Sequence, residues 1–192
     1  MFSQAIVFLL QTFLGLFSIA LLLRFYLQLV RAPARNPVSQ FLAALTDFAV
    51  RPARRVIPGL WGIDLSTLVL AWLVEFVLLV AVLLVIGQAF GAEIGLSVVG
   101  LILLAAVNVL RASLYILMGA LIVQAVLSWV APHSSPITPV VNALTRPLLR
   151  PLQRRIPPVG AVDLSPLFAI VALQLILMLP VTWLESVVRS ML

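Results

Sequence analysis

Two short turns of the chain combine arginine with proline at a spacing that could bind phosphate. The first turn reads RPARRVIP and the second reads RPLQRRIP. Six arginines of these turns are candidate binding residues: Arg51, Arg54, Arg55, Arg150, Arg154 and Arg155. A guanidinium group binds phosphate through parallel hydrogen bonds, and each arginine near an anionic membrane surface contributes about 1 kcal/mol to attachment. We expect the turns to dock anionic lipid or a protein partner. The alternative is that these arginines only fix the membrane topology.

Four polar side chains interrupt otherwise apolar runs: Glu75, Arg24, Gln124 and Gln174. Glu75 lies about ten residues into its run, which places it about 15 Å deep in a membrane helix. A charged residue at the centre of such a helix costs about 2.5 to 3.5 kcal/mol and usually faces a partner. Three roles remain open for Glu75: an ion pair with a residue such as Arg24, a proton or cation site, or a protonated acid hydrogen-bonded to a glutamine.

The remaining residues offer little catalytic chemistry. The chain has no cysteine and one histidine, His133, which has no cluster of acids beside it in the sequence. We find no phosphate-binding loop, no paired catalytic carboxylates and no Ser/His/Asp arrangement. The arginine runs are short and alternate with proline and apolar residues, which is atypical of nucleic-acid binding. We therefore expect no enzymatic activity, no metal site, no cofactor and no nucleic-acid partner.

The elements that position these residues are predicted to be membrane helices. Of the 192 residues, 64% are hydrophobic and 9% are charged, against about 25% charged in soluble domains. Runs long enough to cross a bilayer occupy residues 4–30, 65–87, part of 94–130, and 164–184. The third run has 37 residues, or about 55 Å of helix. We prefer a crossing at 111–130, preceded by a separate helix at 94–108 in the outer leaflet, over one overlong helix.

The arginine-rich connections indicate the orientation of the spans. Positively charged connections stay in the cytoplasm, so the two turns are predicted to lie inside. The connection 88–95 and both termini are then predicted to lie outside. No basic residue precedes the first apolar run, so this run is interpreted as a retained span rather than a signal peptide.

The chain contains an internal repeat. Residues 36–68 align with 135–167 at a shift of 99, with 13 of 33 pairs identical, and a shift of 100 places Arg24 on Gln124. We predict two parallel units at 1–92 and 104–192, with 93–103 as a connector or outer-leaflet helix. Each unit carries an amphipathic helix in the cytoplasmic interface. Asp64 and Asp163 precede the second and fourth spans, where each is expected to cap a helix.

The sequences NPVSQF, RPARRVIP and RPLLRPLQRRIPPVGAVDLSP resemble the YggT family, whose members carry this module once or twice. The resemblance implies a small bacterial plasma-membrane protein without established enzymatic activity. It also implies roles in osmotic or potassium tolerance, cell division or, in plastids, cytochrome assembly. We therefore predict an all-α protein of four spans that acts as a membrane scaffold or assembly factor. The alternative is a small ion transporter or channel component that uses Glu75 and Arg24.

Overall fold

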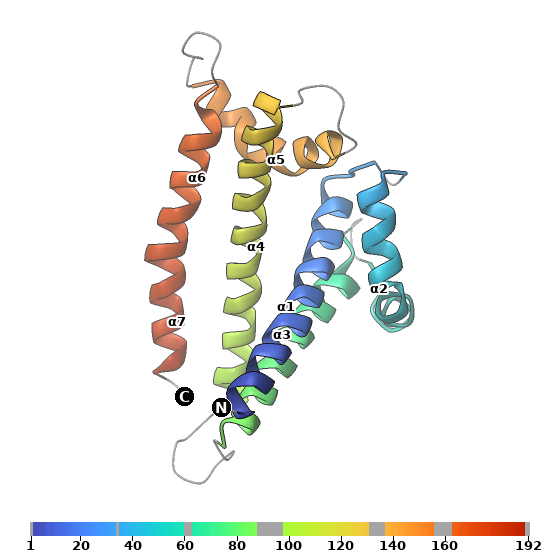
Figure 1. The fold of residues 1–192 in the computed structure, drawn as a ribbon, viewed down its shortest axis with the longest axis vertical. Helices are drawn as coiled ribbons and strands as arrows, with labels where there is room; N and C mark the ends of the chain where they lie inside the picture. The colour runs from blue at the N-terminus through green and yellow to red at the C-terminus, as the bar shows by residue number, and fades with distance from the viewer. Residues whose placement is uncertain are drawn as a thin grey trace.

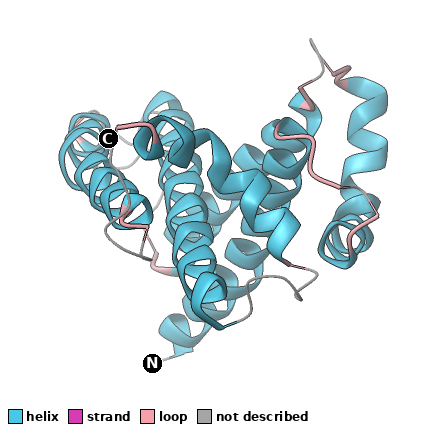
Figure 2. Ribbon diagram, turned by 90° about the horizontal axis from the view of Figure 1, so that it is seen from above, coloured by secondary structure: helices cyan, strands magenta, loops and turns pink. Residues whose placement is uncertain are grey.

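The computed structural model of the chain describes residues 2–33, 35–59, 63–87, 98–130, 137–155 and 163–190. Every regular element in these ranges is a helix, as Figure 2 shows. The elements follow in the order α1 (Phe2–Leu29), α2 (Pro37–Val56), α3 (Leu65–Val85), α4 (Val98–Val130), α5 (Thr138–Gln153), α6 (Ser165–Ile176), the π-helical segment η1 (Leu177–Val181) and α7 (Thr182–Arg189).

Four stretches of helix are long and apolar enough to cross a membrane: Phe2–Leu29, Leu65–Val85, Val98–Ser128 and Ser165–Arg189. They correspond to the four predicted spans. The protein is therefore a multi-pass, all-helical membrane protein, as the composition predicts. Large apolar side chains such as Phe13, Leu16 and Val77 lie exposed on these helices, where acyl chains would cover them.

The two halves of the chain run in parallel (Figure 1). Helices α1 and α4 both begin at the end of the molecule where the two termini lie, and α3 and α6–α7 return to that end. The amphipathic helix α5 makes its connection at the opposite end, whereas α2 begins towards that end and runs back beside α1 to about the middle of the molecule. This arrangement confirms the predicted parallel repeat of span, amphipathic helix and span.

Local sequence explains where α2 begins. The side chain of Asn36 accepts a hydrogen bond of 2.9 Å from the backbone nitrogen of Val38, and Pro37 occupies the first helical position. Both features favour a helix start, because the asparagine satisfies a free N–H and the proline has none to lose. Ser135, which aligns with Asn36 in the repeat, lies outside the described residues.

Three clusters of buried side chains hold the helices together. The first module is packed around Leu21, Leu22, Val50 and Ala71. The second is packed around the larger cluster that includes Leu121, Leu149 and Leu173. A third cluster joins the modules through α1, α2, α4 and α5, and its buried members are Ala20, Leu27, Leu42, Ala120, Val140 and Leu144. The two amphipathic helices therefore connect the halves as well as the spans.

The predicted break in the third span is wrong. Helix α4 is continuous over 33 residues from Val98 to Val130, or about 50 Å, so residues 98–108 do not form a separate element. Residues 94–97 lie outside the described ranges. No proline interrupts this stretch, and Arg111 is not left unpaired there because it forms an ion pair with Glu185 of α7. The overlong single helix is the alternative that the structure favours.

The fourth span continues from α6 into α7 through η1. Pro180 lies inside this segment, and proline removes a backbone donor from the helical ladder. The hydroxyl of Thr182 donates to the carbonyl of Leu177 at 3.0 Å. Insertion of a π-helical turn and a nearby hydroxyl are the usual ways of satisfying carbonyls freed by proline within a membrane helix.

Candidate functional site

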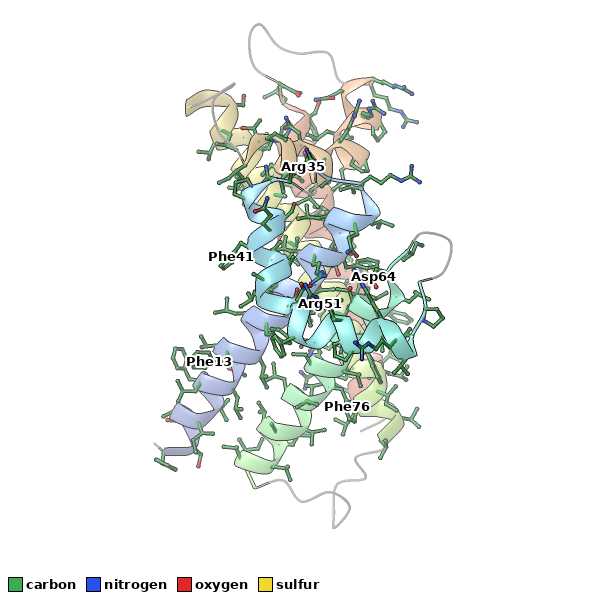
Figure 3. The ribbon with its side chains drawn as sticks, turned by 90° about the vertical axis from the view of Figure 1, so that its right-hand side faces the viewer. Phe13, Arg35, Phe41, Arg51, Asp64 and Phe76 are labelled. Atoms are coloured by element: carbon green, nitrogen blue, oxygen red, sulfur yellow. The ribbon has the colours of Figure 1, made fainter. Side chains whose placement is uncertain are left out.

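The candidate site consists of two basic elbows, which we define as the C-terminal part of an amphipathic helix, the turn after it and the start of the next span. The first elbow joins α2 to α3 and the second joins α5 to α6. Figure 3 labels Arg51 and Asp64 in the region of the first elbow and shows Phe41 projecting from α2. Phe41 and Phe48 are 66% and 72% exposed, so α2 offers an apolar face to the membrane as well as cations to its surface.

A carboxylate closes the first elbow. Nη2 of Arg54 lies 2.6 Å from Oδ2 of Asp64, and the hydroxyl of Thr67 donates to the same oxygen at 2.5 Å. The hydroxyl of Ser66 donates to the other carboxylate oxygen. With its amide oriented by the surrounding groups, Gln28 of α1 adds a donor to Asp64 and an acceptor to Arg54. The end of α2, the start of α3 and the end of α1 are thus tied at one carboxylate, an arrangement that we call the clasp.

The clasp changes the ionisation of Asp64. Burial alone raises the pKa of this carboxyl, but hydrogen bonds from Arg54, Ser66 and Thr67 and the positive charge of Arg54 more than offset it, so the pKa falls to about 2. Asp64 is therefore firmly charged at neutral pH, which stabilises the contact with Arg54.

The second elbow has the same clasp without a guanidinium. Nε2 of Gln153 donates to Oδ2 of Asp163 at 2.8 Å, and the backbone nitrogen of Ser165 donates to Oδ1 at 2.9 Å. Burial raises the pKa of Asp163, but the hydrogen bonds from Ser165 and Gln153 outweigh it, so the pKa is lowered. Gln153 stands 99 residues after Arg54, and Asp163 stands 99 residues after Asp64. The repeat therefore preserves the contact while replacing one charged partner by a neutral one.

The two predicted caps differ in detail from the structure. Asp163 accepts the backbone N–H of Ser165, the first residue of α6, from one position before the N-cap residue Leu164. Asp64 occupies the N-cap position of α3, but its side chain accepts no backbone hydrogen bond. The predicted backbone cap at Asp64 is thus corrected, because Arg54 and two hydroxyls take up its oxygens instead.

Arg24 does not pair with Glu75, the partner named in the sequence analysis. Its Nη1 atom lies 2.8 Å from Oδ1 of Asp47 and 2.7 Å from the hydroxyl of Thr46, both on α2. Arg51 contacts the other oxygen of Asp47 at 2.7 Å. The hydrogen bond from Arg24 is the main cause of the lowered pKa of Asp47, to which the charges of Arg24 and Arg51 add against the effect of burial.

The four predicted intramembrane polar residues are not brought together. Glu75 is 8% exposed and forms no hydrogen bond or ion pair with any residue that the structure describes. Gln174 lies exposed on α6. Gln124 of α4 has a buried carbonyl oxygen with no partner and lines a pocket against α5. The hydrogen bond between Glu75 and a glutamine, one of the three roles left open by the sequence, is therefore absent within the described ranges.

The sequence analysis missed two acids that pair with arginines. Asp47 compensates Arg24 and Arg51, and Glu185 pairs with Arg111 and, at 2.9 Å, with Arg189. Each acid stands four residues before an arginine on its own helix, the spacing of a helical ion pair. That spacing could have identified both acids, although not their partners on α1 and α4.

The six turn arginines fall into two groups. All six lie exposed. Arg51 and Arg54 form ion pairs with acids. Within the described ranges, four of the six have no acidic partner: Arg55, Arg150, Arg154 and Arg155. Most of the uncompensated charge of the turns thus lies on the second elbow.

The described residues contain no group of three or more His, Cys, Asp or Glu side chains that could hold a metal ion. His133 lies outside these residues. Polar contacts at the elbows are made by guanidinium, carboxylate, amide and hydroxyl groups. Of these, the guanidinium, amide and hydroxyl groups can donate hydrogen bonds to a phosphate or a polar headgroup.

Comparison with known proteins agrees with this architecture. The sequence model of the CCB3/YggT family matches residues 3–85 and again 103–184. The chain belongs to the CCB3/YggT family. The two matches coincide with the two parallel modules of the structure, so this member carries the YggT module twice. No solved structure matches the chain significantly.

Relatives in the YggT family are similar along most of their length. An uncharacterized protein of Pseudomonas aeruginosa, PA0392, is 42% identical over 178 residues, which are 92% of this chain and 88% of the relative. The uncharacterized protein YggT of Escherichia coli K12 is 34% identical over 173 residues, which are 90% of this chain and 87% of the relative. An uncharacterized protein of Vibrio alginolyticus is 34% identical over 170 residues, covering 87% and 88%.

Proposed function

We propose that this YggT-family protein is a non-enzymatic scaffold or assembly factor of the bacterial inner membrane. It presents its basic elbows to anionic lipid and to a membrane or cytoplasmic protein partner, in cell division, envelope organisation or osmotic homeostasis. The observation that carries the proposal is the group of exposed turn arginines that have no acidic partner in the part of the chain that the structure describes, above all Arg150, Arg154 and Arg155. Arginines that served only internal packing would be paired with acids or buried.

The clasps support a presenting role because they tie the end of each amphipathic helix to the start of the next span. In the first elbow, Asp64 ties Arg54 to the first turn of α3. In the second, Asp163 ties Gln153 to the start of α6. A helix end held in this way loses less conformational freedom on binding than a free segment, which favours recognition of a partner by the arginines that it carries.

The alternative function, ion transport, has less support. It requires polar residues of several spans on one inward stripe. Arg24 is instead engaged by Asp47 at the elbow, and Gln174 lies exposed on α6. Glu75 remains as a buried acid, which is little for a conduction path.

Photo-crosslinking in cells tests the proposal. A crosslinking side chain is placed at Val56, which is 80% exposed in the first turn, and separately at Leu152 in the second elbow. A probe at Leu175, which is 52% exposed on the lipid-facing side of α6, serves as the control. We expect the elbow probes to capture a defined set of proteins and anionic lipids that the control does not capture.

The arginines themselves are tested in the background of these probes. Replacement of the four unpaired arginines by glutamine is expected to reduce capture at the elbows several-fold. Replacement by lysine keeps the four charges and therefore the topology, and serves as the matched control for insertion. Unchanged capture in a glutamine variant that retains the wild-type topology would contradict the proposal and leave only a topological role for these arginines.

A further inference from the structure

The two modules differ at one place where the repeat predicts equivalence. In the first module, Arg24 of α1 reaches across to α2, where it contacts the carbonyl of Ala43 at 3.4 Å, the hydroxyl of Thr46 at 2.7 Å and the carboxylate of Asp47 at 2.8 Å. The side chain of Arg24 is 10% exposed. Its positive charge is therefore compensated within the module.

The sequence of the second module contains no counterpart of this ion pair. Gln124 of α4 takes the place of Arg24 at a shift of 100, and Asn142 and Arg146 of α5 take the places of Ala43 and Asp47 at a shift of 99. Thr145 is buried and donates to the carbonyl of Val141 at 2.9 Å, as Thr46 does to Leu42 at 2.6 Å. The backbone frame is thus retained, while the acid has become a base.

A polar pocket occupies this place. Gln124, Asn142, Arg146 and Gln153 are among the residues lining a pocket of about 460 Å³ between α4 and α5. A second pocket of about 200 Å³ shares Gln124 and Asn142 and also contacts Thr138. A pocket of about 380 Å³ also lies beside Arg24 in the first module, but there Asp47 already binds the guanidinium.

Two oxygens that line these adjoining pockets, one shared by both and one in the smaller pocket, are without hydrogen-bond partners. The carbonyl oxygen of Gln124 and the hydroxyl of Thr138 are both buried and unbonded. Burial of such groups costs about 1 to 3 kcal/mol each unless a partner is supplied. Arg146 is exposed at the pocket and has no acidic partner among the described residues. An anion that also carries hydroxyl groups would pair with Arg146 and supply hydrogen bonds to the two oxygens.

We propose that the pocket between α4 and α5 binds the headgroup of an anionic, hydroxylated phospholipid of the phosphatidylglycerol type. The phosphate pairs with Arg146, which stands where Asp47 stands in the first module. The headgroup hydroxyls bond Gln124 and Asn142, which both pockets share, and Thr138 of the smaller adjoining pocket. A phosphodiester matches the guanidinium geometry. A pocket at the predicted interface, beside an amphipathic helix, receives such a group from the surrounding leaflet. The site is distinct from the turn arginines that carry the proposed function.

The test measures lipid binding to the full-length protein in mild detergent by native mass spectrometry. The probe is short-chain phosphatidylglycerol, with phosphatidylethanolamine of the same chain length and inorganic phosphate as comparisons. We expect selective retention of phosphatidylglycerol. Arg146→Gln is expected to weaken it at least about fivefold, the equivalent of losing one arginine contact at a membrane surface.

A second variant introduces the ion pair of the first module into the second module. Gln124→Arg with Arg146→Asp supplies the ion pair that Arg24 and Asp47 form, so it is expected to fold while losing phosphatidylglycerol binding. Arg154→Gln changes the net charge by the same amount outside the pocket and is expected to bind as the wild type does.

Three results would overturn the proposed lipid site. The first is equal phosphatidylglycerol binding in the wild type and the double variant. The second is a loss of phosphatidylglycerol binding in Arg154→Gln as large as that in Arg146→Gln. The third is binding of inorganic phosphate as tight as that of the lipid. Loss of phosphatidylglycerol binding in the pocket variants, with unchanged crosslinking at the elbows, would support this lipid site. The scaffold proposal would then be decided by the crosslinking experiment alone.

Discussion

Arg24 on α1 and Asp47 on α2 form an ion pair of 2.8 Å that joins the first span to its amphipathic helix. The two side chains are 10% and 26% exposed, whereas Arg51, which binds the same carboxylate, is 76% exposed. The inner pair is therefore the one that anchors the helix, because water screens the outer pair.

We predict that Asp47→Asn destabilises the protein by on the order of 2 kcal/mol. This is less than the 3 to 5 kcal/mol of a fully buried pair, because Asp47 is partly exposed. The double variant Arg24→Gln/Asp47→Asn is expected to be more stable than Asp47→Asn, since it leaves no buried charge unpaired. Arg51→Gln serves as the control and should cost less than about 1 kcal/mol. Thermal unfolding in detergent measures the stability of all three variants. Equal losses of stability in Asp47→Asn and Arg51→Gln would show that the inner pair stabilises the protein no more than the outer pair does.

The clasp predicts a pH dependence of stability. The pKa of Asp64 is about 2 in the folded protein against an ordinary value of 3.8. The unfolded chain therefore binds more protons in this range, so the stabilisation by charged Asp64 is complete above about pH 4 and is lost as the pH falls through 2. After allowance for solvent screening of the exposed Arg54, we expect a loss of about 1 kcal/mol.

This dependence is measured by unfolding the wild type and Asp64→Asn between pH 5 and pH 2. The wild type should lose more stability than the variant over that interval. Arg55→Gln changes a neighbouring arginine that has no contact with Asp64, so its profile should follow the wild type. Parallel profiles for the wild type and Asp64→Asn would mean that Arg54 and the hydroxyls do not stabilise the charged carboxylate.

Glu75 provides the sharpest distinction between scaffold and transporter. It is 8% exposed and has no ion-pair partner within the described residues. We predict that Glu75→Gln inserts normally, reaches wild-type abundance and loses no stability, because no ion pair is removed and the shape is kept. Growth under potassium or osmotic stress is the functional measurement. A loss of ion-dependent growth at normal abundance would favour the transport alternative, and Gln174→Glu, at the equivalent position of the repeat, is the control for general sensitivity of the spans.

Much of the fold could be predicted from the sequence, and the reasons are physical. The spans follow from bilayer thickness, and the start of α2 follows from Asn36 and Pro37. The repeat required Asp64 and Asp163 to behave alike, and both close an elbow. The partner of Arg24 could not be predicted, because the contact joins two helices whose relative rotation depends on packing. Continuity of α4 was missed because hydrophobicity alone does not distinguish a long tilted helix from two short ones.

At the far end of the second module, Glu185 of α7 pairs with both Arg111 of α4 and Arg189. Its side chain is 14% exposed, and those of Arg111 and Arg189 are 31% and 63% exposed. We predict that Glu185→Gln lowers stability by about 1 to 2 kcal/mol, a shift in the unfolding temperature of roughly 2 to 8 °C for a chain of this size. The exchange Arg111→Glu/Glu185→Arg should recover part of this loss, whereas Arg189→Gln should cost less than about 0.5 kcal/mol. Absence of any recovery in the exchange variant would argue that Arg111 and Glu185 do not stabilise each other.

The parallel modules make a final prediction about orientation. In Figure 1 both elbows lie away from the end that holds the two termini, the first about half-way along the long axis and the second at the opposite end. With the arginine-rich end in the cytoplasm, reporters fused after Arg55 and after Arg155 should both be active in the cytoplasm, whereas a reporter after Gly87 should be active outside. Lysine in place of Arg55, Arg154 and Arg155 should leave this pattern unchanged, because the orientation depends on positive charge and not on guanidinium geometry. A parallel pair of modules places both elbows on the same side of the membrane. Opposite locations for the Arg55 and Arg155 fusions would therefore be incompatible with it.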